Sequence, residues 1–547
     1  MRTPARLQVR PGTIAVGLDV RRLIRVVIAC AAAMGVFGLG AAASQARTTP
    51  PTFGADYVST TLAGGEPFVI YSHGARDLVY SGHEGTTHID RTYTTTPGSS
   101  CDLRTMTGFL CSYDNQVNIW YSTDQGRTWT KSPGNPLYSG FSDPSLTEDA
   151  GNNIYDTGID LANDALFASS DGGKTWPVGT PQCHEGDRPW LAGGKPGEVF
   201  MSTDTVEGGH EFFHGTNSGG SLTCSSNGIP DNGGAGQSYY DHQTGSLIEG
   251  VAFPDGGYGI GVLPNASNAD FTSSTTTTPF VQHEGINCRI YPQYCTELGP
   301  IAPEIAIDGN NTVYVVWATN PRSNSGTMGC NQVTPNDLGG PTLLQNQVVM
   351  IYTTDGGQTW SAPKVIASPT PDPSDSSADP FNGHTVIWPW ITAGAAGNVS
   401  VAYYEGNQLT DPDCDSANLG GHEPTDWTIQ VANIFGATSR SATYPPASVD
   451  AVPNFDGNHP GGVFHRGGIC QSGTTCAATG QDRRLGDYFT NALDQNGCVM
   501  IASADTQLVD STTGAAATSN EYSTGRPIFV EQVGGPSLTT GQPCTVP

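Results

Sequence analysis

Three octads decide the fold of this 547-residue chain: STDQGRTW at residues 122–129, SSDGGKTW at residues 169–176 and TTDGGQTW at residues 353–360. All three fit the pattern S/T-x-D-x-G-x-T-W. The aspartate can accept hydrogen bonds from turn amides, the glycine can adopt left-handed backbone angles, and the tryptophan can cover a hydrophobic layer. The octads therefore predict hairpin turns in which Asp124, Asp171 and Asp355 are structural rather than catalytic or metal-binding.

The octads resemble Asp-boxes, the signature of sialidase-like (BNR-repeat) β-propellers. In that superfamily an Asp-box forms the turn between the third and fourth strands of a blade. The resemblance covers most of the chain as an architecture, and it implies a secreted bacterial protein similar to exo-α-sialidases. Because Asp-boxes also occur in propellers that are not sialidases, the motif specifies the fold better than the activity.

Seven segments repeat a second pattern, which is an apolar run, a turn of Gly, Asn or Asp, and a second run rich in Val, Tyr or Ile. Paired short strands of this kind are the unit of a propeller blade. The segments begin at Glu66, Pro144, Pro189, Ser246, Pro303, Pro389 and Tyr488. We expect an all-β, sialidase-like propeller over residues 47–547 as a single domain, with seven blades favoured over the six of sialidases. Residues 265–300 and 368–383 are predicted to be long surface loops.

The composition supports an all-β fold. Charged residues make up 14% of the chain and hydrophobic residues 36%, with 70 Gly, 39 Pro, 20 Tyr and 9 Trp. Few charges and many glycines exclude a coiled coil or a helical bundle. Glycine supplies turn positions with positive φ, while aromatic and β-branched residues fit a pleated surface.

The N-terminus is typical of an export signal. Arg21, Arg22 and Arg25 precede an apolar stretch at residues 26–39, and small residues follow before a predicted mature start at Arg47. The Arg21-Arg22 pair leaves twin-arginine export open. No second stretch long enough to span a membrane follows. Residues 1–46 are therefore predicted to be a signal peptide, and the mature protein to be secreted and extracellular.

Net charge and cysteine count narrow the class of partner. Without residues 1–46 the chain holds 17 basic and 50 acidic residues, a net charge of −33, which argues against nucleic acid as a partner. Twelve cysteines remain, an even number that suits disulfides in an oxidising compartment. Pairing neighbours along the chain predicts Cys101–Cys111, Cys183–Cys224, Cys288–Cys295, Cys330–Cys414, Cys470–Cys476 and Cys498–Cys544.

The predicted blade geometry also predicts a working face. If Asp-boxes occupy one face, the starts of the innermost strands meet on the opposite face. Carboxylates there can act as acid, base or nucleophile, arginines can bind a carboxylate, and aromatic rings can stack on sugars. The candidate catalytic residues are Asp187, Glu304, Glu405 and Tyr488, and the candidate substrate-binding residues are Arg188, Trp190, Trp388, Trp390, Arg484 and Asp487.

The resemblance implies how such a face would work in a sialidase. It implies an arginine triad, a tyrosine nucleophile assisted by a glutamate, and an aspartate acid/base. Tyr488 resembles the late tyrosine of that superfamily in chain order, and Arg188, Arg466 or Arg484 could join a triad. We expect an exo-α-sialidase-like glycoside hydrolase, most plausibly monomeric, that cleaves terminal sugars from glycans. A hydrolase or lyase of another polysaccharide and a non-catalytic glycan-binding adhesin remain open alternatives.

No cofactor is required by this interpretation. The sequence has no phosphate-binding GxxxxGK motif, no GxSxG elbow and no dinucleotide fingerprint after a strand. Asp411, Asp413 and Asp415 have the spacing of a calcium loop, but glycine is missing at its sixth position and His422 stands at its twelfth. A structural calcium ion there is an alternative to a plain disulfide-linked loop.

Overall fold

The fold was analysed in a computed structural model of the chain. The residues it describes are 49–62, 64–83, 117–135, 142–159, 164–183, 186–205, 209–231, 236–254, 256–272, 279–295, 303–319, 346–368, 384–408, 412, 424–471, 482–507 and 525–545. Among them, no helix has the length and apolar character needed to cross a membrane. The only helices in these ranges are single 3₁₀ turns at Ala266–Asn268, Pro292–Tyr294 and Pro460–Gly462.

The strands of the described residues form seven antiparallel sheets, here called blades 1 to 7. Blade 1 is β2 (Gly65–Tyr71), β3 (Leu78–His83), β4 (Asn118–Ser122) and β5 (Thr130–Lys131); blade 2 is β6 (Leu146–Glu148), β7 (Ile154–Ile159), β8 (Asp164–Ser169) and β9 (Val178–Thr180). Blade 3 is β10 (Asp187–Gly193), β11 (Glu198–Asp204), β12 (His210–Ser218), β13 (Ser221–Cys224) and β14 (Ile229–Pro230); blade 4 is β15 (Tyr239–Asp241), β16 (Ser246–Ala252), β17 (Tyr258–Leu263) and β18 (Val281–Glu284). Blade 5 is β19 (Glu304–Ile307), β20 (Val313–Ala318), β21 (Val348–Thr353) and β22 (Lys364–Ala367); blade 6 is β23 (Thr385–Ala393), β24 (Asn398–Gly406), β25 (Asp426–Phe435), β26 (Val449–Asp450) and β27 (His465–Arg466). Blade 7 is β28 (Thr490–Leu493), β29 (Val499–Asp505), β30 (Arg526–Gly534) and β1 (Thr52–Tyr57).

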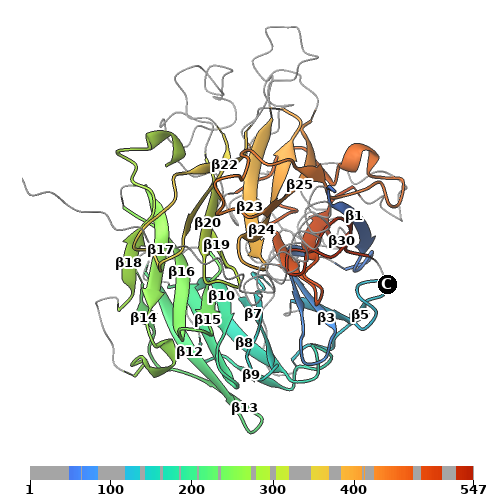
Figure 1. Cartoon of the computed structure of the whole chain (residues 1–547). Coiled ribbons are helices and arrows are strands. Elements are labelled where there is room, and N and C mark those ends of the chain that lie inside the picture. The colour runs from blue at the N-terminus through green and yellow to red at the C-terminus, as the bar shows by residue number, and fades with distance from the viewer. Residues whose placement is uncertain are drawn as a thin grey trace, which may run out of the picture. The chain divides into compact units, whose positions relative to one another are not determined.

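The seven blades close into a ring. The first strands of successive blades contact one another in the order β2, β6, β10, β15, β19, β23 and β28, and β28 contacts β2 again. The ring is closed by β1, which pairs antiparallel with β30 and so joins the two ends of the propeller in one sheet. Figure 1 shows β1 in blue beside β30 in red. The predicted seven-bladed, all-β fold is confirmed.

Each Asp-box forms the turn between the third and fourth strands of its blade, as predicted. In the first box the Ser122 hydroxyl donates to Asp124 at 2.8 Å, and Asp124 accepts from the Thr128 N–H at 2.9 Å and the Thr128 hydroxyl at 2.6 Å. The boxes at Asp171 and Asp355 repeat these bonds. Gly126 has a φ of 86° and its N–H donates to the Ser122 hydroxyl, so the turn requires the left-handed angles of glycine.

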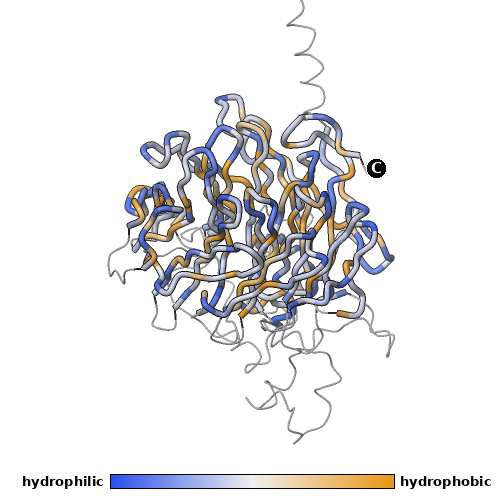
Figure 2. Tube along the Cα trace, turned by 90° about the horizontal axis from the view of Figure 1, so that it is seen from below, coloured by the Kyte–Doolittle hydropathy of each residue, from blue (hydrophilic) through white to orange (hydrophobic). Residues whose placement is uncertain are grey.

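Hydrophobic residues fill the spaces within and between blades. The strand β20 shows why: its residues VYVVWA are all buried, and β-branched and aromatic side chains pack well on both sides of a twisted sheet. Figure 2 shows the hydrophobic segments running along the strands, with hydrophilic residues concentrated in the connections. This packing holds the first strands in place around the axis.

The predictions about disulfides and about a long loop had different outcomes. Three of the predicted disulfides are present, Cys183–Cys224, Cys288–Cys295 and Cys498–Cys544, and Cys470 is disulfide-bonded as well. The cysteines at 101, 111, 330, 414 and 476 lie outside the described residues. The prediction of a plain loop over residues 265–300 was wrong in part, because β18 completes blade 4 there. Its sequence VQHE is too short and polar to show an alternating pattern.

Candidate active site

A repeated backbone distortion marks the starts of four first strands. On β2, Gly65 pairs with His83 and Phe68 with Ser81, so three steps on one strand oppose two on its neighbour. The same single extra residue occurs on β10, on β23 and just before β6. In each case a residue with positive φ precedes a proline: Glu66 (45°), Asp143 (51°), Arg188 (56°) and Trp388 (50°).

These four residues are strained. A side chain other than glycine at positive φ costs on the order of 1–3 kcal/mol, and such strain gathers at functional sites. A bulge also redirects the side chain of the extra residue. Because the strands that carry them line the axis of the ring, blades 1, 2 and 3 bring Glu66, Asp143 and Arg188 together.

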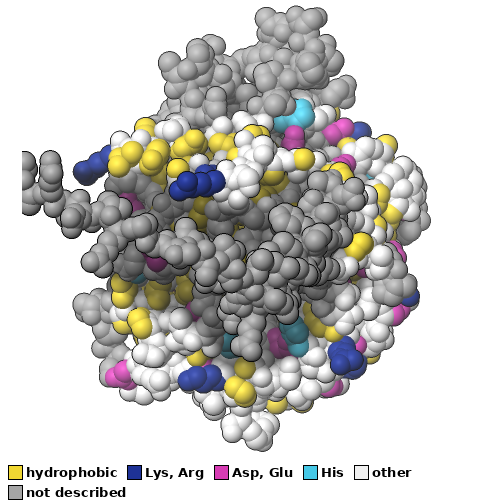
Figure 3. Space-filling model, in the orientation of Figure 1, with side chains coloured by type: hydrophobic (Ala, Val, Ile, Leu, Met, Phe, Trp, Pro, Cys, Tyr) yellow, Lys and Arg dark blue, Asp and Glu magenta, His cyan; other side chains and the backbone are white. Residues whose placement is uncertain are grey.

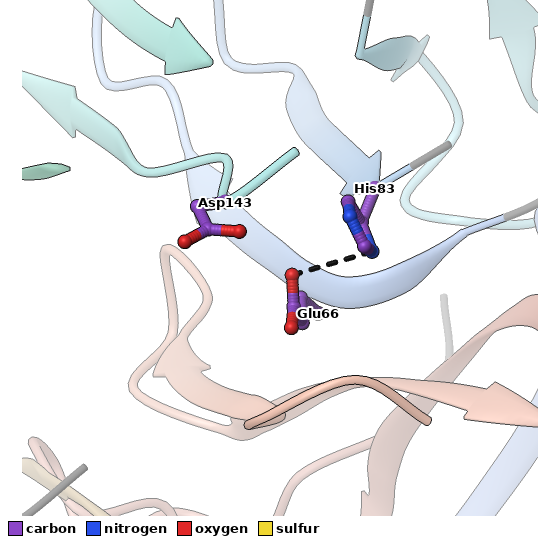
Figure 4. Close-up of side chains that lie close together, drawn as sticks. All are labelled: Glu66, His83 and Asp143. Atoms are coloured by element: carbon purple, nitrogen blue, oxygen red, sulfur yellow. Dashed lines mark ion pairs between the residues drawn. The ribbon is translucent and has the colours of Figure 1, made fainter. Parts of the chain in front are cut away.

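The charged side chains around the axis form one group, here called the channel cluster: Glu66, His83, Asp143, Asp187, Arg188, Arg483 and Asp487. His83 Nδ1 lies 3.2 Å from Glu66 Oε2, and Arg483 Nη2 lies 3.4 Å from Glu66 Oε1. The other terminal nitrogen of Arg483 contacts Asp487 and donates to the Gly486 carbonyl at 2.9 Å. Figure 4 shows Glu66 and His83 from blade 1 facing Asp143, which comes from the start of blade 2.

The electrostatics of the cluster favour a bound proton. Burial, followed by the charges of Asp143 and Asp487, raises the pKa of Glu66 well above its usual range, although Arg483 opposes the rise. Burial and the nearby Asp187 raise the pKa of Asp143 to about 7. The carboxyl groups of Glu66 and Asp143 cannot both ionise without a large repulsion, so this pair shares a proton near neutral pH.

Exposure differs strongly within the cluster. Glu66 and Asp143 are buried, at 1% and 8% exposure. Asp187 is exposed and Arg188 is half-buried, at the first two positions of β10. Asp187 and Arg188 are therefore more accessible than Glu66 and Asp143 in the described part of the propeller.

Comparison with known proteins supports the fold. The BNR/Asp-box repeat family matches residues 120–131 and 351–362, which include two of the three octads. The chain is an Asp-box β-propeller. This is the architecture that the resemblance to sialidase-like proteins implied.

Solved structures similar to this propeller are distant. The GH93 α-L-arabinofuranosidase of Fusarium graminearum is 12% identical, with 88% of this chain and 97% of that chain covered and a TM-score of 0.34. A mutant of NanB sialidase from Streptococcus pneumoniae is 11% identical, with coverage of 87% and 70% and a TM-score of 0.35. An endo-arabinase from Bacteroides thetaiotaomicron is 10% identical, with coverage of 88% and 97% and a TM-score of 0.28. No curated protein matches.

Of the predicted site residues, Asp187, Arg188 and Asp487 belong to the channel cluster of the propeller, and Tyr488 lies beside it. The Tyr488 hydroxyl donates to the Pro144 carbonyl at 2.7 Å, and its ring lies 5.1 Å from that of Trp190 and 5.9 Å from that of Trp390. Burial, with the charges of Glu66 and Asp143, raises the pKa of Tyr488 well above its usual range. In this arrangement the hydroxyl acts as a hydrogen-bond donor.

The predicted tryptophans are buried in the propeller. Trp190 and Trp390 are 1% and 3% exposed, and their rings pack 5.9 Å apart in the core between blades. Trp388 is 4% exposed and packs 5.5 Å from the ring of Tyr404. Since protein covers all three rings, none presents an open face to a sugar in this structure.

The remaining predicted residues lie apart from the cluster. Arg484 is buried and binds Asp482 through Nε at 2.9 Å and Nη2 at 2.5 Å. Glu405, at the end of β24, pairs with His384 at 2.5 Å. Glu304 begins β19, where its Oε2 accepts from the Gln237 N–H at 3.3 Å and burial raises its pKa to about 8. Each of these groups is engaged with its own neighbours.

Glu66, His83, Asp143 and Arg483 were not among the site residues predicted from the sequence. The available signal was the X-Pro pair at the start of four of the seven repeated segments, EP, DP, RP and WP, whose first residue carries the strained backbone.

Two sets of buried side chains in the described residues could hold a metal ion, with ligand atoms within 4.8 Å of one another. They are Glu66, His83 and Asp143, and His210, Asp231 and Glu249. In the first set Arg483 already brings a positive charge to Glu66. The predicted calcium loop, with Asp411, Asp413, Asp415 and His422, lies outside the described residues.

The visible described surface of the propeller carries few basic side chains. In Figure 3 Lys and Arg side chains are widely separated among hydrophobic and neutral ones. The whole chain has 23 basic and 51 acidic residues. A phosphate backbone binds to a continuous basic surface, and the exclusion of nucleic acid as a partner stays a prediction from the net charge.

Proposed function

We propose that the protein is a glycoside hydrolase whose active site is the channel cluster. The observation that supports this is the buried Asp143 carboxyl, with a pKa of about 7, between the buried Glu66 and the exposed Asp187. Glycoside hydrolysis needs one carboxyl group that carries a proton and a second that is charged. Different environments for neighbouring carboxyl groups create that division of roles.

The proposed roles follow from burial and contacts. Asp143 acts as the general acid and donates its proton to the oxygen of the leaving sugar. Asp187, exposed at the start of β10, acts as nucleophile or activates a water molecule. Glu66, held by His83 and Arg483, shares the proton of Asp143 and keeps that carboxyl group in place. These last three residues are positioning residues.

The charge of the cluster favours a neutral glycan. Four carboxyl groups, from Glu66, Asp143, Asp187 and Asp487, surround two guanidinium groups, from Arg188 and Arg483. Arg483 already binds two of the carboxyl groups. An anionic sugar would be repelled unless further arginines joined, so a neutral sugar at the cleavage site fits better.

Exo-α-sialidase activity is the second candidate. Arg188 and Arg483 in one cluster support it, because guanidinium groups bind the carboxylate of sialic acid. Arg484 pairs with Asp482 and Arg466 with Asp426 at 2.5 Å, so neither adds a third arginine in this arrangement. A glycan-binding adhesin is the third alternative, and the buried positions of Trp190, Trp388 and Trp390 provide no stacking surface for it.

Product analysis tests the proposal. The purified protein is incubated with sialyllactose and with a panel of neutral oligosaccharides, and released sugars are identified by mass spectrometry. We expect release from a neutral glycan, and loss of about 10²- to 10⁴-fold in turnover in Asp143→Asn and Asp187→Asn. Because Asp143 must be protonated to act as an acid, kcat should fall as the pH rises through about 7.

Asp56→Asn is the matched control, since Asp56 is an exposed aspartate on β1. It should retain wild-type turnover. Free sialic acid from sialyllactose, lost in Arg188→Ala, would replace our proposal with the sialidase candidate. Wild-type turnover in Asp143→Asn would remove Asp143 from the chemistry, and glycan binding without any product would favour the adhesin.

We also propose that the protein works outside the cytoplasm. Three disulfides in the described residues support this, because disulfides persist in oxidising compartments. The predicted signal at residues 1–46 supports it independently. Mass spectrometry of the exported protein should find Arg47 as its first residue.

A further inference from the structure

A second buried cluster lies between blades 3 and 4. His210 is the first residue of β12, Asp231 follows β14, and Glu249 lies in the middle of β16 in the neighbouring blade. We call these three residues the interblade cluster. All are buried, with exposures of 9%, 7% and 1%. The channel cluster and its proposed chemistry use none of them.

The side chains of the interblade cluster converge on one point. One potential ligand atom from each residue lies within 4.8 Å of those of the other two. His210 Nδ1 contacts Asp231 Oδ2 directly. Ligands of one divalent ion bound at about 2.0–2.2 Å lie about 3–4 Å apart, so the three groups can bind one ion after small movements.

Glu249 gives the strongest indication that the interblade cluster binds a cation. Both of its carboxylate oxygens are buried, and no donor group of the described residues hydrogen-bonds to either of them. The Asp231 carboxylate is its charged neighbour within the cluster. A buried carboxylate facing a second carboxylate requires a cation or a proton to offset the repulsion and the lost hydration.

Three other buried carboxyl groups, those of Glu66, Asp487 and Glu304, have such compensation. At the channel cluster the Arg483 guanidinium contacts Glu66 and Asp487. At Glu304 a main-chain N–H donates to one oxygen. Among the described residues, Glu249 has neither a guanidinium contact nor a main-chain N–H donor. The His210 imidazole contacts the neighbouring Asp231 carboxylate. The interblade cluster is therefore the better candidate for a metal ion.

We propose that His210, Asp231 and Glu249 bind a divalent first-row transition-metal ion, represented by Zn²⁺, that joins blades 3 and 4. Imidazole nitrogen together with carboxylate oxygen suits zinc and its neighbours, whereas calcium and magnesium prefer ligand sets made of oxygen alone. The ion offsets the two carboxylate charges and links strands of separate sheets. Its role at this position is structural.

The register of blade 3 places this site relative to the channel cluster. Asp187 pairs with Asp204 across β10 and β11, and Asp204 pairs with His210 across β11 and β12. Two strand spacings separate His210 from Asp187, about 10 Å. A metal ion bound to His210 would therefore lie apart from the proposed catalytic carboxyl groups. The metal site does not depend on the proposed glycosidase activity.

Zinc binding by the full chain tests the proposal. The purified protein is stripped with EDTA and titrated with Zn²⁺ by isothermal calorimetry, and its metal content is measured by mass spectrometry. We expect about one zinc ion per chain. Glu249→Gln and Asp231→Asn should weaken binding by more than about 100-fold. EDTA should lower the melting temperature of the wild type and leave that of Glu249→Gln unchanged.

Two control variants locate the ion. Glu304→Gln removes another buried carboxyl group and should bind zinc like the wild type, and Glu66→Gln should do the same. Loss of zinc in Glu66→Gln alone would place the ion at the channel cluster and overturn the proposal. A wild type that binds no Zn²⁺, with a Glu249→Gln variant that melts at a higher temperature, would show that a proton neutralises Glu249 instead.

Discussion

The fold buries the carboxyl group of Glu304 with little hydrogen bonding. Glu304 is 2% exposed at the first position of β19, and its Oε1 has no hydrogen-bond partner among the residues that the structure describes. Burial is the cause of the rise of its pKa to about 8, which the Gln237 N–H offsets only in part. The ordinary pKa of a glutamate is about 4.3, so this residue binds a proton in the folded chain at neutral pH.

The pH dependence of stability follows from that shift. Between about pH 4.3 and 8 the folded chain holds a proton at Glu304 that the unfolded chain has lost, so the free energy of unfolding falls as pH rises, by about 1.4 kcal/mol per pH unit from this group. Glu304→Gln should remove this contribution and melt at a higher temperature than the wild type at pH 8. Thermal denaturation from pH 5 to 9 measures it. Asp56→Asn, at an exposed site, should follow the wild-type curve; parallel curves for Glu304→Gln and the wild type would contradict the expected proton.

Individual residues also show which parts of the candidate site cannot be predicted from the sequence. Arg483 and Arg484 are adjacent, yet Arg483 contacts Glu66 in the channel cluster and Arg484 binds Asp482. Both arginines lie in an irregular turn just before β28, and such a turn has no periodic pattern that would predict which of the two joins the channel cluster. Glu66 was missed because its side chain is directed by a bulge, and the one extra residue breaks the alternation on which strand patterns depend.

At the scale of elements, the turn between the first and second strands of a blade joins it to the next blade. In blade 5 the Asp308 side chain accepts from the N–H groups of Asn310 and Thr312 at 2.8 and 3.0 Å. It also accepts from the Tyr314 hydroxyl at 2.9 Å and from the Gly397 N–H of blade 6 at 2.6 Å. Asp149 in blade 2 makes the corresponding bonds to Tyr155 and to Gly197 of blade 3.

Removing this carboxylate should therefore loosen two blades. Asp308→Ala leaves four donors without their acceptor, and we expect the free energy of unfolding to fall by about 3 kcal/mol. Urea denaturation of the purified variants measures the change. Asp494→Ala is the matched control, because Asp494 serves the same turn in blade 7, and among the described residues its side chain bonds only to Asn496 and Cys498 within that turn. Its cost should be about 1 kcal/mol; equal losses would show that the bond across the blades contributes nothing.

The elements predicted from sequence are those with local chemistry. An Asp-box aspartate bonds to groups within four residues, so Asp124 and Thr128 identify their turn without any tertiary information. The seven repeated segments are likewise hairpins formed by near neighbours in the chain. The channel cluster is different, because Glu66 and Arg483 are 417 positions apart and meet only when the ring closes.

Closure of the whole molecule depends on a strand that the repeated pattern does not reveal. The residues TFGADY of β1 pair with β30 along their whole length, and their partners lie at the far end of the chain. The Tyr57 hydroxyl donates to Asp505 at 2.7 Å and to Asp456 at 2.9 Å, which ties the end of β1 to blades 6 and 7. Six residues with one turn-forming glycine carry too little local signal to be recognised as a strand.

Removing β1 should open the ring. A chain that lacks residues 1–57 leaves the edge of β30 unpaired and exposes Ile528 and Val530, which are fully buried in the intact propeller. An open, apolar edge strand pairs with other chains, so we expect aggregation and a melting temperature lower by about 5 °C or more. A chain that lacks only residues 1–46 keeps β1 and should stay monomeric and melt like the full chain. Calorimetry with light scattering distinguishes the two. If both truncated chains stay monomeric and melt together, the ring is held by contacts among its first strands, and β1 is a covering strand rather than the closure.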